Sequence, residues 1–410
     1  MSAVYILGGD QTDFAEPWSR RGLGLFEMME SAVRGALSNT ELAPEDVDAS
    51  HVANFVGELF AGQGHLGGFF AAIDPGFEGK PSSRHEAACA SGSIAVLAAQ
   101  AEILAGLHDC VVVVGVEQMR NVKGDVAAKH LAAAAWVGKE AEEATYCWPY
   151  MFSKLADEYE ARYGLDARHL ARIGEINLLN AKRNPRSQTR GWGFNEKSFT
   201  PDEKENPIIE GRIRKHDCSQ VTDGACAVVL ASERFARAWA EKRGKKLEDL
   251  SVIRGFGHRT STMLYSEKIA KSRGERHVFP QVRGTIEDAF RRAGIPDVSG
   301  VDLIETHDCF TPTEYMAIDH FGITAPGEAW KAVEDGRIEL GGSIPINPSG
   351  GLIGCGHPVG ATGIRMLLDG HRQVTGAAGD YQVEGARTAA TLNIGGSATT
   401  IVSFVVGRAG

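Results

Sequence analysis

Apolar stretches alternate with amphipathic stretches along the first part of the chain. Residues 3–9 form a short apolar run typical of a strand, and residues 24–40 have the apolar spacing that favours a helix. Two further strand-like runs occupy residues 49–57 and 110–119, and between them a helix is predicted to begin just after Cys89. This alternation predicts crossover units and a largely parallel sheet.

The same order of segments returns in the second part of the chain. "SVIRGFGH", which begins at Ser251, corresponds to "AVYILGGD" near the start, and "VSGVDLIETHD" corresponds to "VDASHVANFVG". Residues 222–232 close the first part and residues 395–407 close the second, each with glycine and small residues ahead of a β-branched run. We therefore predict two duplicated α/β halves.

The middle of the chain is helix-rich and strongly charged, and then becomes irregular at "NPRSQTRGWGFNEKSFTPDEKENP". We predict an inserted helical loop domain at 121–217. The N-terminal half is then built from 1–120 and 218–248, and the C-terminal half from 249–410. The insertion is either a lid that contacts ligand or a helical cover without ligand contacts.

Composition and charge narrow the class of protein. Hydrophobic residues make up 43 % and charged residues 23 %, as in ordinary soluble globular proteins. The net charge of −10 without a long basic run argues against a nucleic-acid partner. No apolar run reaches the roughly 18 residues of a membrane span, and "MSAVYILGGD" lacks the pattern of a signal peptide. Seven cysteines, an odd number, favour a reducing compartment, so we expect a cytoplasmic protein.

Cys89 is the first candidate for chemistry. It lies among very small residues in "EAACASGS", directly before the predicted helix. The thiolate is the nucleophilic form of cysteine, and the positive end and free N–H groups of a helix N-terminus favour an anion. Small neighbours also leave space for a bulky group beside the sulfur. The same pattern is typical of a buried structural thiol, so the residue alone leaves both interpretations open.

Three more reactive side chains lie in turns bounded by glycine or proline. His307 and Cys309 follow an apolar strand in "VDLIETHDCFTP", and His357 lies in the glycine-rich "NPSGGLIGCGHPVGATG" ahead of a helix. Strand-to-helix turns of a parallel sheet gather at one edge, so these side chains are expected to converge on Cys89. An imidazole beside a thiol forms an activated nucleophile.

Six motifs occur in the order that is familiar from one family: "CASGS", "NAKRNP", "CSQVTDGACAVVLAS", "HDCF", "GGLIGCGHPVGATG" and "NIGGSATT". Through nearly its whole length the chain resembles the thiolase superfamily, in particular the sterol-carrier-protein-2-type and archaeal-type thiolases. The resemblance implies two similar α/β halves in a five-layered αβαβα arrangement with an inserted helical loop domain. It also implies a homodimer or homotetramer.

The resemblance implies a role for each reactive residue. Cys89 would carry the acyl group, and His357 would take its proton and help to hold the thioester oxygen. His307 would help to form one oxyanion site, and backbone N–H groups of Cys89 and Gly395 would form the other. Cys309 would supply the second thiol for acid–base chemistry.

Two further positions follow from the same resemblance. Ser219 of "CSQVTDG" aligns with a family serine near the pantetheine arm of coenzyme A. The chain departs from the common family pattern at Asn393, where a late cysteine is usual, and Cys309 is expected to replace that cysteine.

The implied activity is acyl transfer through an acyl-cysteine intermediate. The enzyme would either cleave a 3-ketoacyl-CoA with CoA or condense an acyl-CoA with acetyl-CoA. CoA would be a substrate, with no permanently bound cofactor and no metal, and acyl-CoA and CoA would be the partners. The aromatic segment 145–159 either lines an acyl tunnel or forms the buried face of the lid, so the acyl group stays open.

Three alternatives remain. Two cysteines and two histidines that converge would suit zinc, although no CxxC or HxxxH knuckle is present. A non-catalytic thiolase-like subunit would hold acyl-CoA for a larger complex, but it would not need the full set of reactive groups. A ketoacyl synthase would lack the second thiol of "HDCF".

Four basic residues either meet CoA phosphates or form a solvated face: Lys182, Arg183, Arg186 and Arg190.

Overall fold

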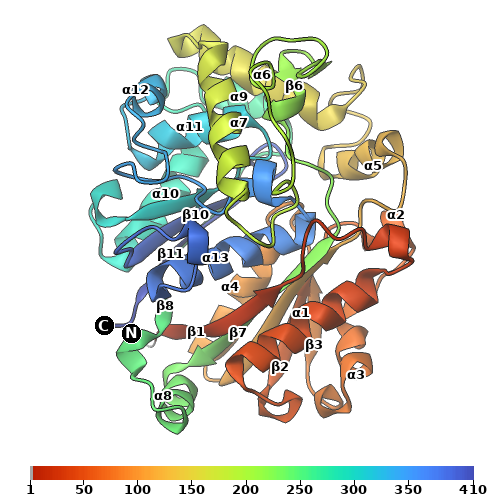
Figure 1. The fold of residues 1–410 in the computed structure, drawn as a ribbon, viewed down its shortest axis with the longest axis vertical. Coiled ribbons are helices and arrows are strands. Elements are labelled where there is room, and N and C mark those ends of the chain that lie inside the picture. The colour runs from red at the N-terminus through yellow and green to blue at the C-terminus, as the bar shows by residue number, and fades with distance from the viewer. Residues whose placement is uncertain (1–2) are drawn as a thin grey trace.

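The computed structural model describes residues 3–410 and is built around one mixed sheet of nine strands (Figure 1). The strand order is β3-β2-β4-β7-β1-β8-β11-β10-β9. The first half contributes β1 (Val4–Gln11), β2 (Ala49–Ala53), β3 (Ser82–His85), β4 (Cys110–Glu117) and β7 (Gly224–Ser232). The second half contributes β8 (Ser251–Thr260), β9 (Leu303–Thr306), β10 (Thr388–Gly395) and β11 (Thr400–Arg408).

The two halves repeat one strand pattern. In the first half β7 pairs with β1 and β4, and β4 pairs with β2. In the second half β11 pairs with β8 and β10, and β10 pairs with β9. The halves join where β1 runs antiparallel to β8, from Val4 opposite Ile253 to Ile6 opposite Ser251. This confirms the predicted duplication, with β3 as an additional edge strand of the first half.

The sheet is mixed, so the prediction of a largely parallel sheet was wrong. Only β2 with β3, β2 with β4, and β9 with β10 are parallel, whereas β1–β7, β1–β8, β4–β7, β8–β11 and β10–β11 are antiparallel. The prediction failed because a long apolar strand indicates only that helices cover both faces of the sheet. Helices cover both faces of this sheet, although most neighbouring strands are antiparallel.

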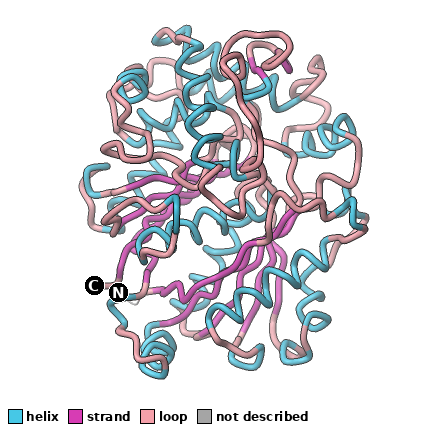
Figure 2. Tube along the Cα trace, viewed as in Figure 1, coloured by secondary structure: helices cyan, strands magenta, loops and turns pink. Residues whose placement is uncertain are grey.

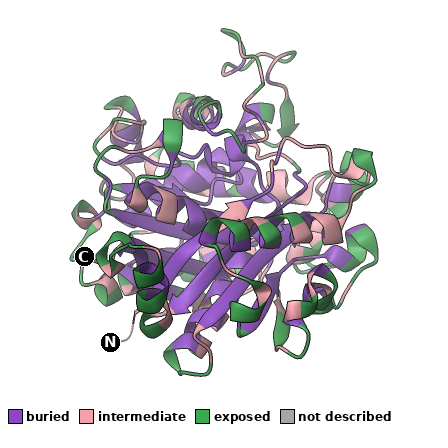
Figure 3. Ribbon diagram, turned by 60° about the horizontal axis from the view of Figure 1, so that its bottom comes forward, coloured by how far each residue is buried: buried purple, intermediate pink, exposed green. Residues whose placement is uncertain are grey.

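Helices complete five layers. α1 (Leu25–Thr40) packs on β1, β7 and β4, and α10 (Pro280–Ala293) packs on β8 and β11. Between the two half-sheets lie α4 (Ser91–Leu104), which contacts β2 and β4, and α13 (Thr362–Thr375), which contacts β10, β11 and β7. Figure 3 shows the buried strands enclosed by helices whose outer faces are exposed. The five-layered αβαβα arrangement is therefore confirmed.

The insertion lies over one end of the sheet, at the top of Figure 1, and much of it is loop in Figure 2. It carries α5 (Gly124–Leu131), α6 (Cys147–Tyr163), α7 (Ala167–Ala181) and the small hairpin of β5 (Ile208–Glu210) and β6 (Ile213–Arg214). The domain boundaries proposed from the sequence stay predictions. The other helices are α2 (Gly57–Ala61), α3 (Phe69–Ile73), α8 (Glu233–Lys242), α9 (Tyr265–Lys271), α11 (Thr311–Phe321) and α12 (Ala329–Glu334). Within residues 3–410, no helix has the length and apolar character that crossing a bilayer requires.

Candidate active site

One cavity of about 390 Å³ brings the four reactive residues together. Cys89, His307, Cys309 and His357 all line it, although they come from three turns that are far apart in the sequence. Cys89 precedes α4, the His307–Cys309 turn joins β9 to α11, and His357 precedes α13. Ser219 lines the same cavity. The convergence expected from the sequence is therefore present, while the roles of these residues stay predictions.

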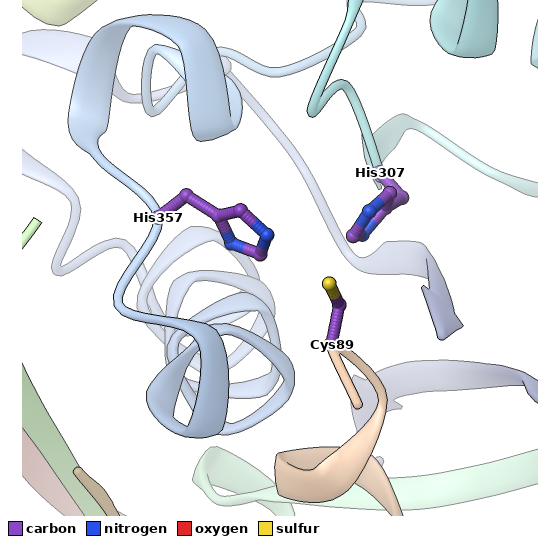
Figure 4. Close-up of side chains that lie close together, drawn as sticks. All are labelled: Cys89, His307 and His357. Carbon is purple, nitrogen blue, oxygen red and sulfur yellow. The ribbon is translucent and has the colours of Figure 1, made fainter. Parts of the chain in front are cut away.

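Three of the side chains form a close group. One ligand atom each from Cys89, His307 and His357 lies within 4.8 Å of the other two, and the side chains point toward one another (Figure 4). The two imidazole centroids are 5.4 Å apart and the rings are nearly perpendicular, at 85°. Cys309 lies outside this trio, with its Sγ 4.0 Å from Thr313 Oγ1. Its thiol is thus a neighbour of the trio within the cavity.

A tight turn presents the Cys89 thiol. Ala88 has a φ of 50°, in the left-handed region that alanine rarely adopts. The turn is held by N–H bonds from Ala90 to the Ala87 carbonyl (3.0 Å) and from Ser91 to the Ala88 carbonyl (3.1 Å). The Ser91 hydroxyl also donates to the Ala88 carbonyl at 2.6 Å. Strained backbone of this kind persists only where its surroundings enforce it, and it is typical of functional sites.

The Cys89 thiol is protonated at rest. Burial raises its pKa to about 12, although the backbone N–H of Gly396 acts in the opposite direction. Ionising such a thiol at pH 7 costs about 7 kcal/mol, at about 1.4 kcal/mol per pKa unit. The sequence led us to expect that the helix end would favour the anion. Burial outweighs that effect, so the thiol needs a base within the site.

His357 has the geometry of that base. The Thr362 hydroxyl donates to the Pro358 carbonyl at 3.1 Å, so we assign its 2.7 Å contact with His357 Nδ1 as a bond in which Nδ1–H donates. The Nε2 lone pair is then left to accept a proton. Burial and the positive charge of Arg365 lower the pKa of His357 to about 3, so the imidazole is neutral at rest. Gly356, with a φ of +121°, allows the chain to turn just before this residue.

His307 has the opposite tautomer to His357. Its side chain is fully buried, and Asn393 Nδ2 lies 3.3 Å from its Nδ1. Because the amide nitrogen can only donate, Nδ1 accepts and the proton lies on Nε2. Among the residues that the structure describes, His307 Nε2 has no hydrogen-bond partner. Burial and the neighbouring His357 hold the pKa of His307 well below its usual value. This residue therefore offers a neutral, unpartnered N–H donor.

Asp308 joins two of the reactive turns. Its carboxylate accepts from the backbone N–H groups of Leu352 (2.5 Å) and Ile353 (3.1 Å) and from Asn177 Nδ2 (2.9 Å). Burial raises the pKa of Asp308 to about 6. These bonds tie the "HDCF" turn to the glycine-rich turn that leads to His357.

The predicted oxyanion donor Gly395 does not line the cavity, whereas its neighbour Gly396 does. Gly395 is the last residue of β10, opposite Thr400 of β11. The backbone N–H that acts to lower the pKa of the Cys89 thiol belongs to Gly396. The role of Gly395 stays a prediction.

Aromatic side chains of the insertion wall the cavity. Tyr146, Cys147, Trp148, Pro149 and Phe152 of the aromatic segment line it, whereas Leu155 and Tyr159 belong to the hydrophobic core. The Phe152 ring stacks on Phe310 at 4.7 Å, and Trp148 Nε1 donates to the Leu131 carbonyl at 2.9 Å. The segment therefore both lines the cavity and fills the core beneath it.

The polar lining of the cavity includes residues that sequence reasoning missed. Lys215 and Gln220 line it beside Ser219, and Lys215 is exposed. Within residues 3–410, Lys215 forms no ion pair. No motif singled out this lysine, because it lies three residues before the "CSQVTDG" motif that indicated Ser219.

The basic residues proposed for CoA phosphates are largely used within the chain. Arg190 pairs with Asp13 at 2.6 Å and Arg186 with Asp10 at 3.6 Å, while Lys182 Nζ donates to the Trp192 carbonyl at 2.8 Å. None of these three lines the cavity. Their contacts hold the irregular stretch of the insertion in place.

The Cys89–His307–His357 trio has the ligand types of a zinc site. One feature argues against one: the assigned tautomer places a proton on His307 Nε2, which makes that nitrogen a donor. The trio is better suited to hold a reacting carbonyl compound.

Known families match most of this chain. The thiolase N-terminal domain matches residues 4–187, and the thiolase C-terminal domain-like family matches residues 266–408. An acetyl-CoA acetyltransferase from Methanothermobacter thermautotrophicus is 32 % identical, with 100 % of each chain covered. Human sterol carrier protein 2 is 28 % identical over 98 % of this chain and 72 % of its own length.

Solved structures show the same fold at lower identity. The Ltp2-ChsH2(DUF35) aldolase structure has a TM-score of 0.77 at 21 % identity, over 99 % of this chain and 98 % of that one. A monomeric SCP2-thiolase-like protein from Mycobacterium smegmatis has a TM-score of 0.72 at 16 % identity, over 100 % of this chain and 77 % of that one. With both halves matched and a full-length relative above 30 % identity, this chain belongs to the thiolase family.

Proposed function

We propose that this protein is a CoA-dependent thiolase that transfers acyl groups through an acyl-Cys89 intermediate. One observation carries the proposal: a neutral thiol, a neutral imidazole with a free lone pair, an unpartnered N–H donor and a second thiol line the same cavity. A non-catalytic acyl-CoA-binding subunit would not need this combination. The acetyl-CoA acetyltransferase relatives support the same reading.

In the cleavage direction the first step breaks a carbon–carbon bond. Cys89 Sγ attacks the 3-keto carbon while His357 Nε2 takes the thiol proton. The carbonyl oxygen becomes negative, and a donor such as His307 Nε2–H stabilises it by about 3 kcal/mol. The bond between C2 and C3 then breaks, and its electron pair forms the enolate of the departing acyl-CoA. Cys309 protonates that enolate and becomes a thiolate.

The second step returns the enzyme to its starting state. The thiol of CoA gives its proton to the Cys309 thiolate and attacks the acyl-Cys89 thioester. Cys89 leaves as a thiolate and recovers its proton from the His357 imidazolium. Condensation is the reverse sequence, in which Cys309 deprotonates acetyl-CoA. Every proton is accounted for by these three side chains and the CoA thiol.

The residues that line the cavity indicate which groups of the substrate it would hold. CoA enters as a substrate, we expect no permanently bound cofactor or metal, and Ser219 is proposed to meet the pantetheine arm. The aromatic wall of Trp148, Phe152 and Phe310 suits an apolar acyl group. We expect a homodimer or homotetramer on the basis of family membership.

Incubation with acetoacetyl-CoA, a panel of longer 3-ketoacyl-CoAs and CoA tests this function. Loss of the enolate absorbance reports cleavage, and the purified wild-type chain is expected to cleave at least one member of the panel. Cys309→Ser should still be acylated by a suitable acyl donor but should lose condensation, because a hydroxyl is a far weaker acid. Condensation by Cys309→Ser at the wild-type rate would require another proton carrier. A wild-type protein that binds acyl-CoA without cleaving it would favour the non-catalytic subunit.

A further inference from the structure

We propose that Asn393 is a positioning residue that holds His307 in the tautomer whose Nε2–H faces the cavity, and that Ser93 fixes the orientation of the Asn393 amide. The proposal deepens the thiolase function and rests on it for its catalytic consequence. Asn393 occupies the position at which the common family pattern has its late cysteine. The structure assigns a different task to this position.

The three side chains form one buried chain of hydrogen bonds. The Ser93 hydroxyl donates to Asn393 Oδ1 at 2.8 Å, and Asn393 Nδ2 donates to His307 Nδ1 at 3.3 Å. Ser93 and Asn393 are each 1 % exposed and His307 is 0 % exposed. Water therefore does not compete for these groups, and each bond constrains the next.

The helices around Asn393 favour this orientation of the amide. A flipped amide would place Oδ1 against His307 Nδ1 and would reverse the tautomer. The Asn393 Oδ1 atom, however, lies against the first turn of α13: a Cβ added to Gly363 would be 2.5 Å from it. Ser93 belongs to the first turn of α4. Two helix N-termini, each with a partial positive charge, thus face the carbonyl oxygen and favour it over the NH₂ group at that place.

The consequence is a donor aimed at the reacting oxygen. With Nδ1 committed as an acceptor, His307 carries its proton on Nε2, which has no partner within residues 3–410. A substrate oxygen in the cavity satisfies this N–H. Without the amide, either tautomer would be available, and the one with a lone pair on Nε2 would repel the developing oxyanion. Asn393 thus acts through His307 rather than on the substrate.

Asn393→Asp tests the proposal because it inverts the hydrogen bond. A carboxylate accepts from Nδ1–H and moves the lone pair to Nε2. Loss of one oxyanion donor lowers kcat by about 10²- to 10³-fold. The loss should diminish as the pH falls, because a protonated imidazole regains Nε2–H. Asn121→Asp makes the same substitution at an exposed asparagine that does not line the cavity, and it should leave kcat unchanged.

Nitrogen-15 NMR of histidine-labelled protein reads the tautomer directly, with His307→Asn to assign the signals. We expect Nε2–H in the wild type, Nδ1–H in Asn393→Asp and a mixture in Ser93→Ala, which keeps a small residue at that site. Nδ1–H in the wild type, or an unchanged tautomer in both variants, would overturn the proposal. These spectra need no turnover, so a failure of the thiolase function would be seen separately, as the absence of cleavage by the wild type.

Discussion

The ionisation of Cys89 provides a quantitative test of how the site works. The perturbation is pH alone. Burial disfavours the charged thiolate, so the pKa moves upward, to about 12. At pH 9 a thiol with that pKa is about 0.1 % ionised, whereas an ordinary cysteine with a pKa of about 8.5 is about 75 % ionised. The difference between these two fractions is large enough to decide between a resting thiol and a resting ion pair.

The assay is the thiolate absorbance of the wild type minus that of Cys89→Ser, recorded from about pH 6 to pH 9.5. The subtraction removes the absorbance of the other six of the seven cysteines. We expect no ionisation step in the difference curve over this range. The imidazoles do not alter this expectation, because burial keeps His357 neutral, with a pKa of about 3. A step centred below pH 8 would show a thiolate–imidazolium pair at rest and would refute the reasoning.

Three further predictions concern residues around the cavity. Thr362→Val removes the acceptor that fixes the His357 tautomer, so kcat should fall about tenfold or more with little change in KM; an unchanged kcat in steady-state assays would contradict the assigned tautomer. Gly363→Ala should destabilise the fold by about 1–3 kcal/mol in urea titrations, because its Cβ would lie 2.4 Å from a backbone nitrogen of α4, whereas Gly370→Ala in the same helix meets only ordinary contacts at 3.5 Å. Equal stability of the two variants would argue against the close approach of α4 and α13. Lys215→Ala should raise the KM for CoA substrates and leave kcat nearly unchanged, since this cation lines the cavity without an acidic partner within residues 3–410; a fall in kcat alone would place the lysine in the chemistry instead.

Much of the fold could be predicted because its elements are locally encoded. The buried residues of α1 recur at three- and four-residue intervals from Leu25 to Leu37, and β4 is a continuous apolar run from Cys110 to Val116. The strand β3 could not be predicted, because its sequence, SSRH, is polar and becomes a strand by pairing with β2. Strand direction was also inaccessible, since burial on both faces produces the same apolar run in either direction.

The candidate site could also be predicted only in part from the sequence. Motifs indicated Cys89, His307, Cys309 and His357, because reactive side chains in turns bounded by glycine or proline are visible in a sequence. The pKa of Cys89 was not, because desolvation depends on everything packed around the thiol. Pairs that act together over long separations were also hidden: Ser93 and Asn393 are 300 residues apart.

The most direct test of the central claim is the mass of the acylated protein. The wild type, mixed with a 3-ketoacyl-CoA that it cleaves and quenched in acid before CoA is added, should carry one acyl group on the peptide that contains Cys89. Cys89→Ala should carry none, and Cys309→Ser should retain the adduct when it is given an acyl-CoA donor. An acyl group on any other residue, or one that persists in Cys89→Ala, would contradict the account.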